Sequence, residues 1–297
     1  MAKFDIYFED RNTSPMQRLW LLFKERHPAR IGLWLFLSLL VLAILAPLIS
    51  PYSPYFHNQT ALLMPPAWSS AGHVDYMLGT DDLGRDILSR LMNGARLTFG
   101  LSIISVLVAL FVGLFIGALA GMSSGVKSSF LNHLLDLALS IPSLLIAIII
   151  VAILGPGLAN TVWAIILSSL PLFIHATSNA VSDELKKDYA IAYRLDGASR
   201  YQVLVHAILP NIFESLIIVA TMALSNAILD IAALGFLRLG AQAPSSEWGA
   251  MLAESLDLLY IAPWTVALPG ILIFISVLST NLVGDGLSSA FKRRVQS

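Results

Sequence analysis

Apolar residues gather along the chain into long runs separated by short polar stretches. Six runs are long enough to cross a hydrocarbon core of roughly 30 Å as helices, and they cover residues 31–50, 97–122, 134–154, 160–181, 209–235 and 263–284. Pro142, Pro156 and Pro171 interrupt the third and fourth runs or lie between them, which a helical bundle tolerates where neighbouring helices satisfy the freed backbone groups. The pattern predicts an all-α fold, a polytopic membrane protein with six transmembrane helices.

Composition supports this class and excludes others. The 297 residues are 57% hydrophobic and only 12% charged, whereas about a quarter of a soluble domain is charged. The chain has no cysteine, so disulfides and thiolate metal sites are excluded. Its six histidines show no i,i+4 pair of the kind a metal-binding helix uses. We therefore expect no metal site and no nucleic-acid partner for a chain with a net charge of −1.

Lysine and arginine are divided unequally between the two sides of this arrangement. Six spans place both termini on one side, and fourteen basic residues lie there, in residues 1–30, the loop 123–133, the stretch 182–208 and the C-terminal tail. Four basic residues lie on the other side: Arg85, Arg90, Arg96 and Arg238. Because basic residues are retained in the cytoplasm, the termini and 182–208 are predicted to be cytoplasmic, and residues 51–96 form an external segment.

Residues 1–30 contain an amphipathic stretch, "TSPMQRLWLLFKERHPAR". Ser14 is a candidate N-cap and Pro15 suits the first helical position. Leu19 and Phe23 would share an apolar face opposite the basic residues. We expect a cytoplasmic N-terminal segment with a short amphipathic helix on the inner membrane surface; a disordered arm is the alternative.

The stretch 182–208 carries eight charges between two strongly apolar runs. At roughly 2.5–3.5 kcal/mol per charge at mid-bilayer, burying them in lipid would cost about 20 kcal/mol. The stretch must therefore lie in water. Gly197 permits a tight turn, and Pro210 suits the start of the next membrane helix. The sequence predicts two short projecting helices bent at Gly197, or a well-formed solvated loop.

Four stretches of this sequence resemble one family. "IAYRLDG", nine residues and "AILP" resemble the EAA loop of ABC importer permeases, with Ala192, Gly197, Leu209 and Pro210 on matching positions and Ile191 in place of the glutamate. "LGTDDLGRDILSRLMNGAR", "DIAALGFLRLGAQAPSSEWGAML" and "PWTVALPG…NLVGDGL" resemble segments of the dipeptide/oligopeptide branch. The resemblance covers nearly the whole chain after residue 15, and its last third is most similar to permeases of Sap peptide-uptake systems.

This resemblance implies a type I ABC importer permease fold over residues 31–297 in the bacterial inner membrane. It implies a non-catalytic subunit that imports peptides, including cationic antimicrobial peptides, by alternating access. Its partners would be a second permease, two ATPase subunits that hold the ATP and magnesium, and a periplasmic peptide-binding protein. The helix around Ala198–His206 would dock on an ATPase. The implied coupling residues are Ala192, Arg194, Asp196, Gly197, Ala198, Ser199, Arg200, Gln202, Leu209 and Pro210.

The residues of the external segment also predict a structure without the family resemblance. Thr80 or Asp81 could cap a helix, and Asp82 and Asp86 could pair with Arg85 and Arg90, the pair Asp86–Arg90 at i,i+4. Such a helix would lie on the outer surface as support or contact a substrate-delivery protein. The signature residues of this segment are Gly79, Thr80, Asp81, Gly84, Arg85, Asp86, Ser89 and Arg90.

Small and polar residues inside the spans leave alternatives open. Gly113 and Gly117 could line a peptide path or allow close helix contact. Asp230 is an intramembrane carboxylate that could form an ion pair with Arg238.

Two other functions would need chemistry that the spans do not show. A self-sufficient secondary transporter would need charged groups at mid-membrane. An intramembrane enzyme would need a nucleophile and a base, which are not found at useful spacing. No P-loop motif occurs in the sequence, so ATP-driven transport requires partners.

Overall fold

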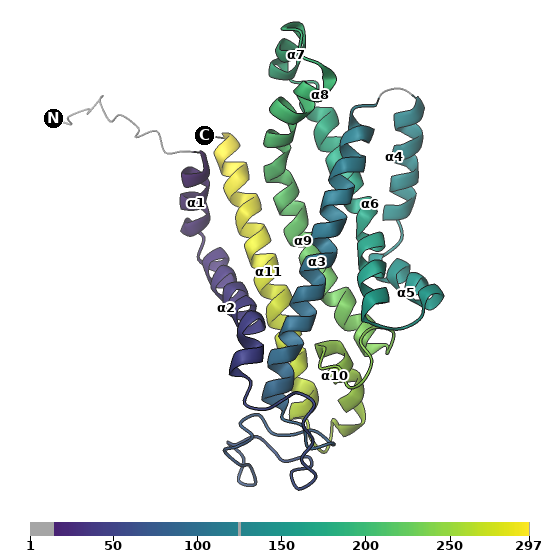
Figure 1. The fold of residues 1–297 in the computed structure, drawn as a ribbon. Helices are drawn as coiled ribbons and strands as arrows, with labels where there is room; N and C mark the ends of the chain where they lie inside the picture. The colour runs from purple at the N-terminus through teal and green to yellow at the C-terminus, as the bar shows by residue number, and fades with distance from the viewer. Residues whose placement is uncertain (1–14, 124–125, 297) are drawn as a thin grey trace, which may run out of the picture.

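The computed structural model describes residues 15–123 and 126–296. Within these ranges the regular structure is helical, and the single β-type pairing is an isolated bridge between Thr80 and Asp86. Figure 1 shows a long bundle of helices that run roughly side by side. Five of them are long and apolar enough to cross a membrane, or six if one bent pair counts as a single span. The all-α prediction is confirmed.

The helices follow the apolar runs closely, with two extensions. The second begins at Ile87 rather than residue 97, and the last continues to Gln296. The elements are α1 Pro15–Glu25, α2 His27–Ile49, α3 Ile87–Gly121, α4 Val126–Leu139, α5 Ser143–Leu154, α6 Leu158–Glu184, α7 Asp188–Leu195, α8 Arg200–Gln202, the π-helix η1 Val203–Ile208, α9 Leu209–Phe236, α10 Trp248–Ser255, the 3-10 turn η2 Leu256–Leu258 and α11 Trp264–Gln296.

The third run, predicted as a span over 134–154 that Pro142 interrupts, is a bent pair of helices. The chain bends by 88° between α4 and α5, and Pro142 lies immediately before α5. Proline lacks the N–H needed to continue the ladder, and its ring clashes with the preceding turn. Pro171, in contrast, lies inside the continuous helix α6. One proline therefore ends a helix here while another is accommodated.

Close contact between α3 and α6 forms the centre of the bundle. A methyl group added at Gly113 would lie 2.4 Å from Cβ of Phe173, and one at Gly117 would lie 2.6 Å from Cβ of Thr177. Neither position has room for a side chain, so these glycines let the two backbones approach. The close-packing interpretation of the small residues in the second run is confirmed. Phe173 itself is fully buried in the apolar core between α3, α5, α6 and α9.

The bundle has two different ends (Figure 1). At one end lie α7, α8, the start of α1 and the C-terminus of α11. At the other lie α10 and a long loop, residues 50–86, that joins α2 to α3. Helix α1 packs on α11 through Leu19 and Phe23, which are buried with Ala290. The helix begins at Pro15 as predicted; the candidate cap Ser14 lies outside the described residues.

Candidate functional site

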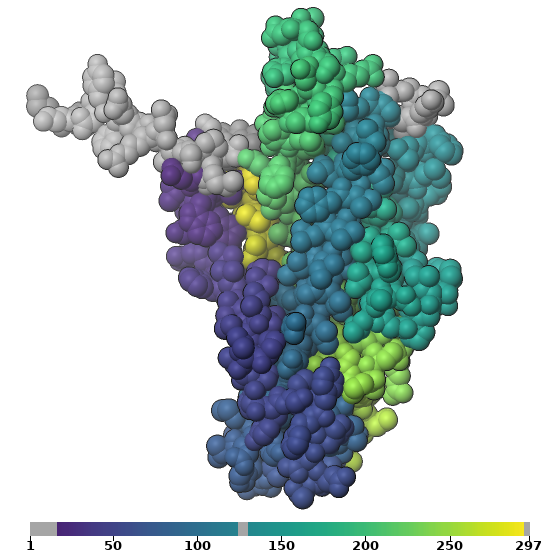
Figure 2. Space-filling view, viewed as in Figure 1, coloured from purple at the N-terminus to yellow at the C-terminus, as the bar shows by residue number. Residues whose placement is uncertain are grey.

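The segment between α6 and α9 stands out beyond the rest of the bundle. In Figure 2 it forms the protrusion above the ends of the neighbouring helices. Helix α6 ends at Glu184, helix α7 follows from Asp188 to Leu195, and a turn at residues 196–199 leads into α8. A single residue of α7, Ala190, is buried. The projection is therefore almost entirely surface.

The turn depends on Gly197, as the sequence predicted. Its φ of +87° lies in the left-handed region, which residues with a side chain rarely adopt. No atom lies within 4 Å of the place a Cβ would occupy, so backbone conformation rather than space selects glycine. Beyond it, Ser199 and Gln202 form a capping box: the Gln202 N–H donates to Ser199 Oγ at 3.3 Å, and the Ser199 N–H donates to Gln202 Oε1 at 2.7 Å. This cap starts the next helix.

The expectation of a second short helix is wrong. After Ser199 the chain stays helical through α8, η1 and α9, so Ala198–His206 is mostly the projecting end of the long helix and not a separate element. Pro210 supplies no N–H for the His206 carbonyl. Just before it the backbone widens into a π-helix, in which the Leu209 N–H donates to the Leu204 carbonyl. Only α7 is an independent short helix in this segment.

Tyr189 connects α7 to the helices on either side. Its hydroxyl donates to Glu184 Oε2 at the end of α6 and accepts from Asn211 Nδ2, 3.2 Å away at the start of α9. Burial, together with the bond to Glu184, raises the pKa of Tyr189 to about 12, so the hydroxyl keeps its proton at neutral pH. No motif pointed to this tyrosine. Its position one residue after the start of a short helix, with a carboxylate five residues earlier, is the only local signal.

The outer face of this projection carries large apolar side chains. Leu195 is 82% exposed and Tyr201 71% exposed, and Ile191 and Tyr193 are also exposed. The residues predicted for coupling fall on the same projection. Ala192 and Arg194 are exposed on α7, Asp196, Gly197, Ala198 and Ser199 form the turn, Arg200 and Gln202 lie exposed on α8, and Leu209 and Pro210 begin α9.

At the opposite end, the 50–86 loop is held by buried polar contacts. Thr80 is fully buried. Its hydroxyl donates to the Ala61 carbonyl and accepts from the Met64 N–H at 2.9 Å, and its carbonyl accepts from Trp264 Nε1 of α11 at 3.2 Å. Gly84 has a φ of +71°, and a Cβ there would lie 2.0 Å from the Asn58 carbonyl oxygen. These contacts fold the loop onto itself and onto α11.

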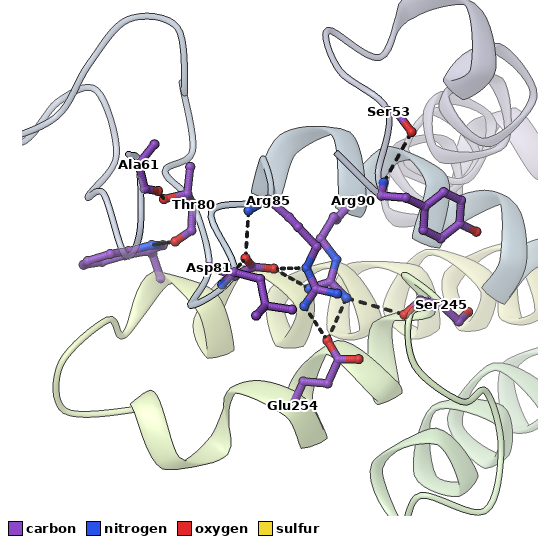
Figure 3. Close-up of polar contacts among 11 residues, drawn as sticks. Ser53, Ala61, Thr80, Asp81, Arg85, Arg90, Ser245 and Glu254 are labelled. Atoms are coloured by element: carbon purple, nitrogen blue, oxygen red, sulfur yellow. Dashed lines mark hydrogen bonds and ion pairs between the residues drawn. The ribbon is translucent and has the colours of Figure 1, made fainter. Parts of the chain in front are cut away.

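Four charged side chains form a closed ring beneath this loop (Figure 3). Asp81 Oδ2 accepts from Arg85 Nε at 2.6 Å and from an Arg90 nitrogen at 2.7 Å. Glu254 Oε2 accepts from the same two guanidinium groups at 2.9 and 2.8 Å. Asp81, Arg85 and Arg90 are each at most 3% exposed, and Glu254 of α10 is 24% exposed. The ring ties the loop, α3 and α10 together without net charge.

The ion pairs predicted for the external segment, between Asp82 or Asp86 and the two arginines, are wrong. Asp86 does not pair with Arg90; it caps α3, accepting from the Ser89 N–H and hydroxyl at 2.8 and 2.6 Å. Asp82 is exposed and has no ion pair in the described part of the chain. Neither Thr80 nor Asp81 caps a helix, because residues 78–86 are loop and α3 starts at Ile87. The amphipathic surface helix expected here is the buried start of a membrane helix.

Reasoning from the sequence missed Glu254. It lies 164 residues after Arg90, so no local spacing could link the two. Gly79 and Ser89 complete the predicted signature set: Gly79 lies beside Trp264, and the Ser89 hydroxyl accepts from the Tyr52 N–H at 3.1 Å. The structure thus brings the whole signature segment together, around a partner that the sequence did not suggest.

Asp230 contacts Ser143 and not Arg238, the partner that the sequence suggested. It lies in α9, and its Oδ2 accepts from the Ser143 hydroxyl at 2.9 Å. Ser143 is the first residue of α5, directly after the break at Pro142. Arg238 makes no ion pair with Asp230. The described residues contain no cluster of three His, Asp or Glu side chains that could hold a metal ion.

Comparison with known proteins identifies the family. A family model described as "Binding-protein-dependent transport system inner membrane component" matches residues 113–297. The chain belongs to this family. A second model, the N-terminal transmembrane domain of oligopeptide transport permease C, matches residues 14–66. The resemblance to the dipeptide/oligopeptide branch of ABC importer permeases is therefore confirmed, and the protein is a multi-pass inner-membrane permease.

Two relatives align with almost the full length of this permease. It is 50% identical over 285 residues to "Peptide transport system permease protein SapC" of Salmonella typhimurium, covering 96% of each chain. It is 46% identical over 283 residues to "Dipeptide transport system permease protein DppC" of Escherichia coli K12, covering 95% of this chain and 94% of that one. A solved structure titled as inward-facing conformations of the MetNI methionine ABC transporter matches with a TM-score of 0.50 and 17% identity, covering 68% of this chain and 97% of that chain. That likeness supports the ABC importer permease fold.

Proposed function

We propose that this permease imports peptides, with energy supplied by separate ATPase subunits that dock on the α7 projection. The observation that carries the proposal is the exposed apolar surface of α7 and α8, with Leu195 82% and Tyr201 71% exposed. Exposed apolar surface on a water-facing projection favours a protein partner. The peptide substrate is supported by the printed names of the relatives SapC and DppC.

The arrangement suggests how force would pass through the chain. Tyr189 bonds to the end of α6 and to the start of α9, so a push on α7 would reach two membrane helices at once. Because α8 and η1 continue directly into α9, movement at Ser199 would also be transmitted along that helix. The subunit itself would do no covalent chemistry. ATP and magnesium would be held by the partner ATPases.

The proposed assembly contains a second related permease, two ATP-binding subunits and a periplasmic peptide-binding protein. The excess of basic residues supports a cytoplasmic location for α7, α8 and both termini and a periplasmic location for the 50–86 loop. Short peptides are the proposed substrate class, and cationic antimicrobial peptides are included because the resemblance extends to Sap systems. The coupling residues would be those from Ala192 to Pro210 named above.

The test uses the absence of cysteine from this chain. Single cysteines at Ser199 or Gln202 report contact with an ATPase, and a cysteine at the exposed Ser70 of the 50–86 loop is the matched control on the other side. We expect crosslinks to an ATPase from the first two positions and none from Ser70. Crosslinks to an ATPase only from Ser70 would mean that the assigned sidedness is inverted.

Intact mass of the complex extracted in mild detergent tests the assembly. Recovery with a second permease and two ATPases, and ATP-dependent peptide uptake after reconstitution, would support the proposal. Gly197→Trp should then abolish uptake while the complex still assembles, since tryptophan cannot easily adopt a φ of +87°. A lone chain that transports without ATP would be a secondary transporter and would refute the proposal.

A further inference from the structure

A cavity of about 460 Å³ lies beside the charged ring, between the 50–86 loop, the α9–α10 connection and α10. Its size lies within the range of about 300–1,000 Å³ that is usual for small-molecule sites. Its charged lining residues are Asp82, Arg85, Arg238 and Glu254, with His57 as a further titratable group. Much of the remaining wall is alanine, including Ala253, which leaves space open. The cavity thus combines small apolar walls with a few polar groups.

Two of the four charges are already neutralised. Arg85 and Glu254 bind each other at 2.9 Å as members of the ring. Asp82 and Arg238 have no ion-pair partner in the described part of the chain, and both are exposed. The cavity therefore offers one free carboxylate and one free guanidinium, held on opposite elements: Asp82 on the loop and Arg238 after α9.

The backbone presents Arg238 in an unusual way. Its φ is +59°, a conformation uncommon for residues other than glycine and found disproportionately at binding sites. Gln242 holds this turn by donating its side-chain amide to the carbonyls of Arg238 and Gly240 at 3.0 and 3.1 Å. These bonds fix the backbone of the turn, and the planar donors of the exposed Arg238 guanidinium suit a carboxylate ligand.

We propose that this cavity receives a short peptide by its two charged ends, with the ammonium group at Asp82 and the terminal carboxylate at Arg238. The inference rests on the proposed peptide-import function and adds a site on this subunit to it. A peptide with free ends carries one charge of each sign, which matches the two unpaired charges. Because only the two charged ends of the peptide would be bound, its side chains would make no selective contacts. Peptides of varied sequence would therefore fit.

The test measures protection of a cysteine in the cavity. Ala253→Cys, or Ala243→Cys as a second reporter, is introduced into the assembled complex without nucleotide. Maleimide labelling of this chain is followed by intact mass. The dipeptide Ala-Ala should protect at a concentration at least tenfold lower than N-acetyl-Ala-Ala or Ala-Ala-amide. Ser70→Cys, exposed on the same loop, should stay unprotected.

Two substitutions test which charged residue binds which end of the peptide. Arg238→Gln should remove the advantage of Ala-Ala over Ala-Ala-amide but keep its advantage over N-acetyl-Ala-Ala; Asp82→Asn should do the reverse. Equal protection by all three peptides, or no protection at either reporter, would overturn the site. So would protection by the peptide-binding protein alone, which would make the cavity a protein-docking surface. ATP-driven uptake, measured on the same preparations, separates the two proposals, since uptake without protection refutes only the cavity site.

Discussion

Replacing Arg90 tests whether the charged ring holds the 50–86 loop in place. Arg90 is 1% exposed and donates to Asp81 at 2.7 Å and to Glu254 at 2.8 Å. Arg90→Met keeps much of the side-chain volume and removes the charge. The ring then contains two carboxylates and one guanidinium, Arg85, so one negative charge loses its compensation in a buried place.

The expected cost follows from that uncompensated charge. Removing one partner of a buried ion pair costs about 3–5 kcal/mol, mostly because the remaining charge is left without compensation. For a large domain 1 kcal/mol shifts the melting temperature by about 2–4 °C. The variant should therefore melt about 6–20 °C below the parent. Replacing the ionised Glu254 as well relieves part of this loss, so Arg90→Met with Glu254→Gln should cost less than the sum of the two single changes.

The assay is tryptophan fluorescence during heating of the purified protein in detergent at one fixed scan rate, because membrane-protein unfolding is rarely reversible. Trp248 is a suitable reporter, since it is fully buried and its Nε1 donates to the carbonyl of Leu91, the residue that follows Arg90 in α3. Arg96→Met is the matched control: Arg96 is exposed on the same helix and should change the melting temperature by about 1 °C or less. If Arg90→Met behaves like Arg96→Met, the ring does not stabilise this end.

Two further substitutions test the loop and the projection. Gly84→Ala should lower the melting temperature, because a Cβ would meet the Asn58 carbonyl at 2.0 Å, whereas Gly100→Ala, with open space around it, should not; equal effects would show that the loop yields. Tyr189→Phe should lower peptide uptake per ATP hydrolysed, whereas Tyr260→Phe, at a 95% exposed position on the opposite end of the bundle, should not. An equal loss in both variants would refute the role of the Tyr189 hydrogen bonds. The raised pKa of Tyr189 favours its protonated form in the folded state. The hydrogen bond from Tyr189 to Glu184 should therefore hold below pH 10 and be lost as pH rises through about 12, as a tyrosinate titration against Tyr189→Phe would show.

Helix positions could be read from the sequence because lipid leaves the backbone little choice. An apolar run of sufficient length must satisfy its own N–H and C=O groups, which a helix does. The run 31–50 accordingly became His27–Ile49, and 160–181 became Leu158–Glu184. The position of the turn at Gly197 was predictable for a similar reason, since a positive φ strongly favours glycine.

Contacts between distant segments were not predictable in this way. Two carboxylates lie nearer to Arg90 in its own segment, Asp82 and Asp86, the latter at the favourable i,i+4 spacing. Arg90 nevertheless binds Asp81 and Glu254. Asp86 instead caps α3 through its Oδ2 atom. The competition between capping and ion pairing depends on where the helix starts, and the apolar pattern placed that start ten residues too late.

The effect of each proline on its helix could not be predicted from the local sequence either. Pro142 separates two helices by 88°, while Pro171 lies inside α6. Each removes one backbone N–H, so the local chemistry is the same. The surroundings differ: at the break, the Ser143 hydroxyl at the start of α5 donates to Asp230 of α9. Such a contact is set by the packed bundle and has no signature in the local sequence.

The two ends of the bundle suit opposite mechanical roles in the proposed transport cycle. The 50–86 loop is joined to α3, α10 and α11 by buried ion pairs and by Thr80. The α7 projection, in contrast, is largely exposed and meets the bundle through Tyr189 and the helix that continues into α9. Because an exposed element with few buried contacts costs little to displace, a push from a partner would move α7 and α9 before it disturbed the loop end. The chain would then rock about the firm loop end, which is also the end where the proposed peptide cavity lies.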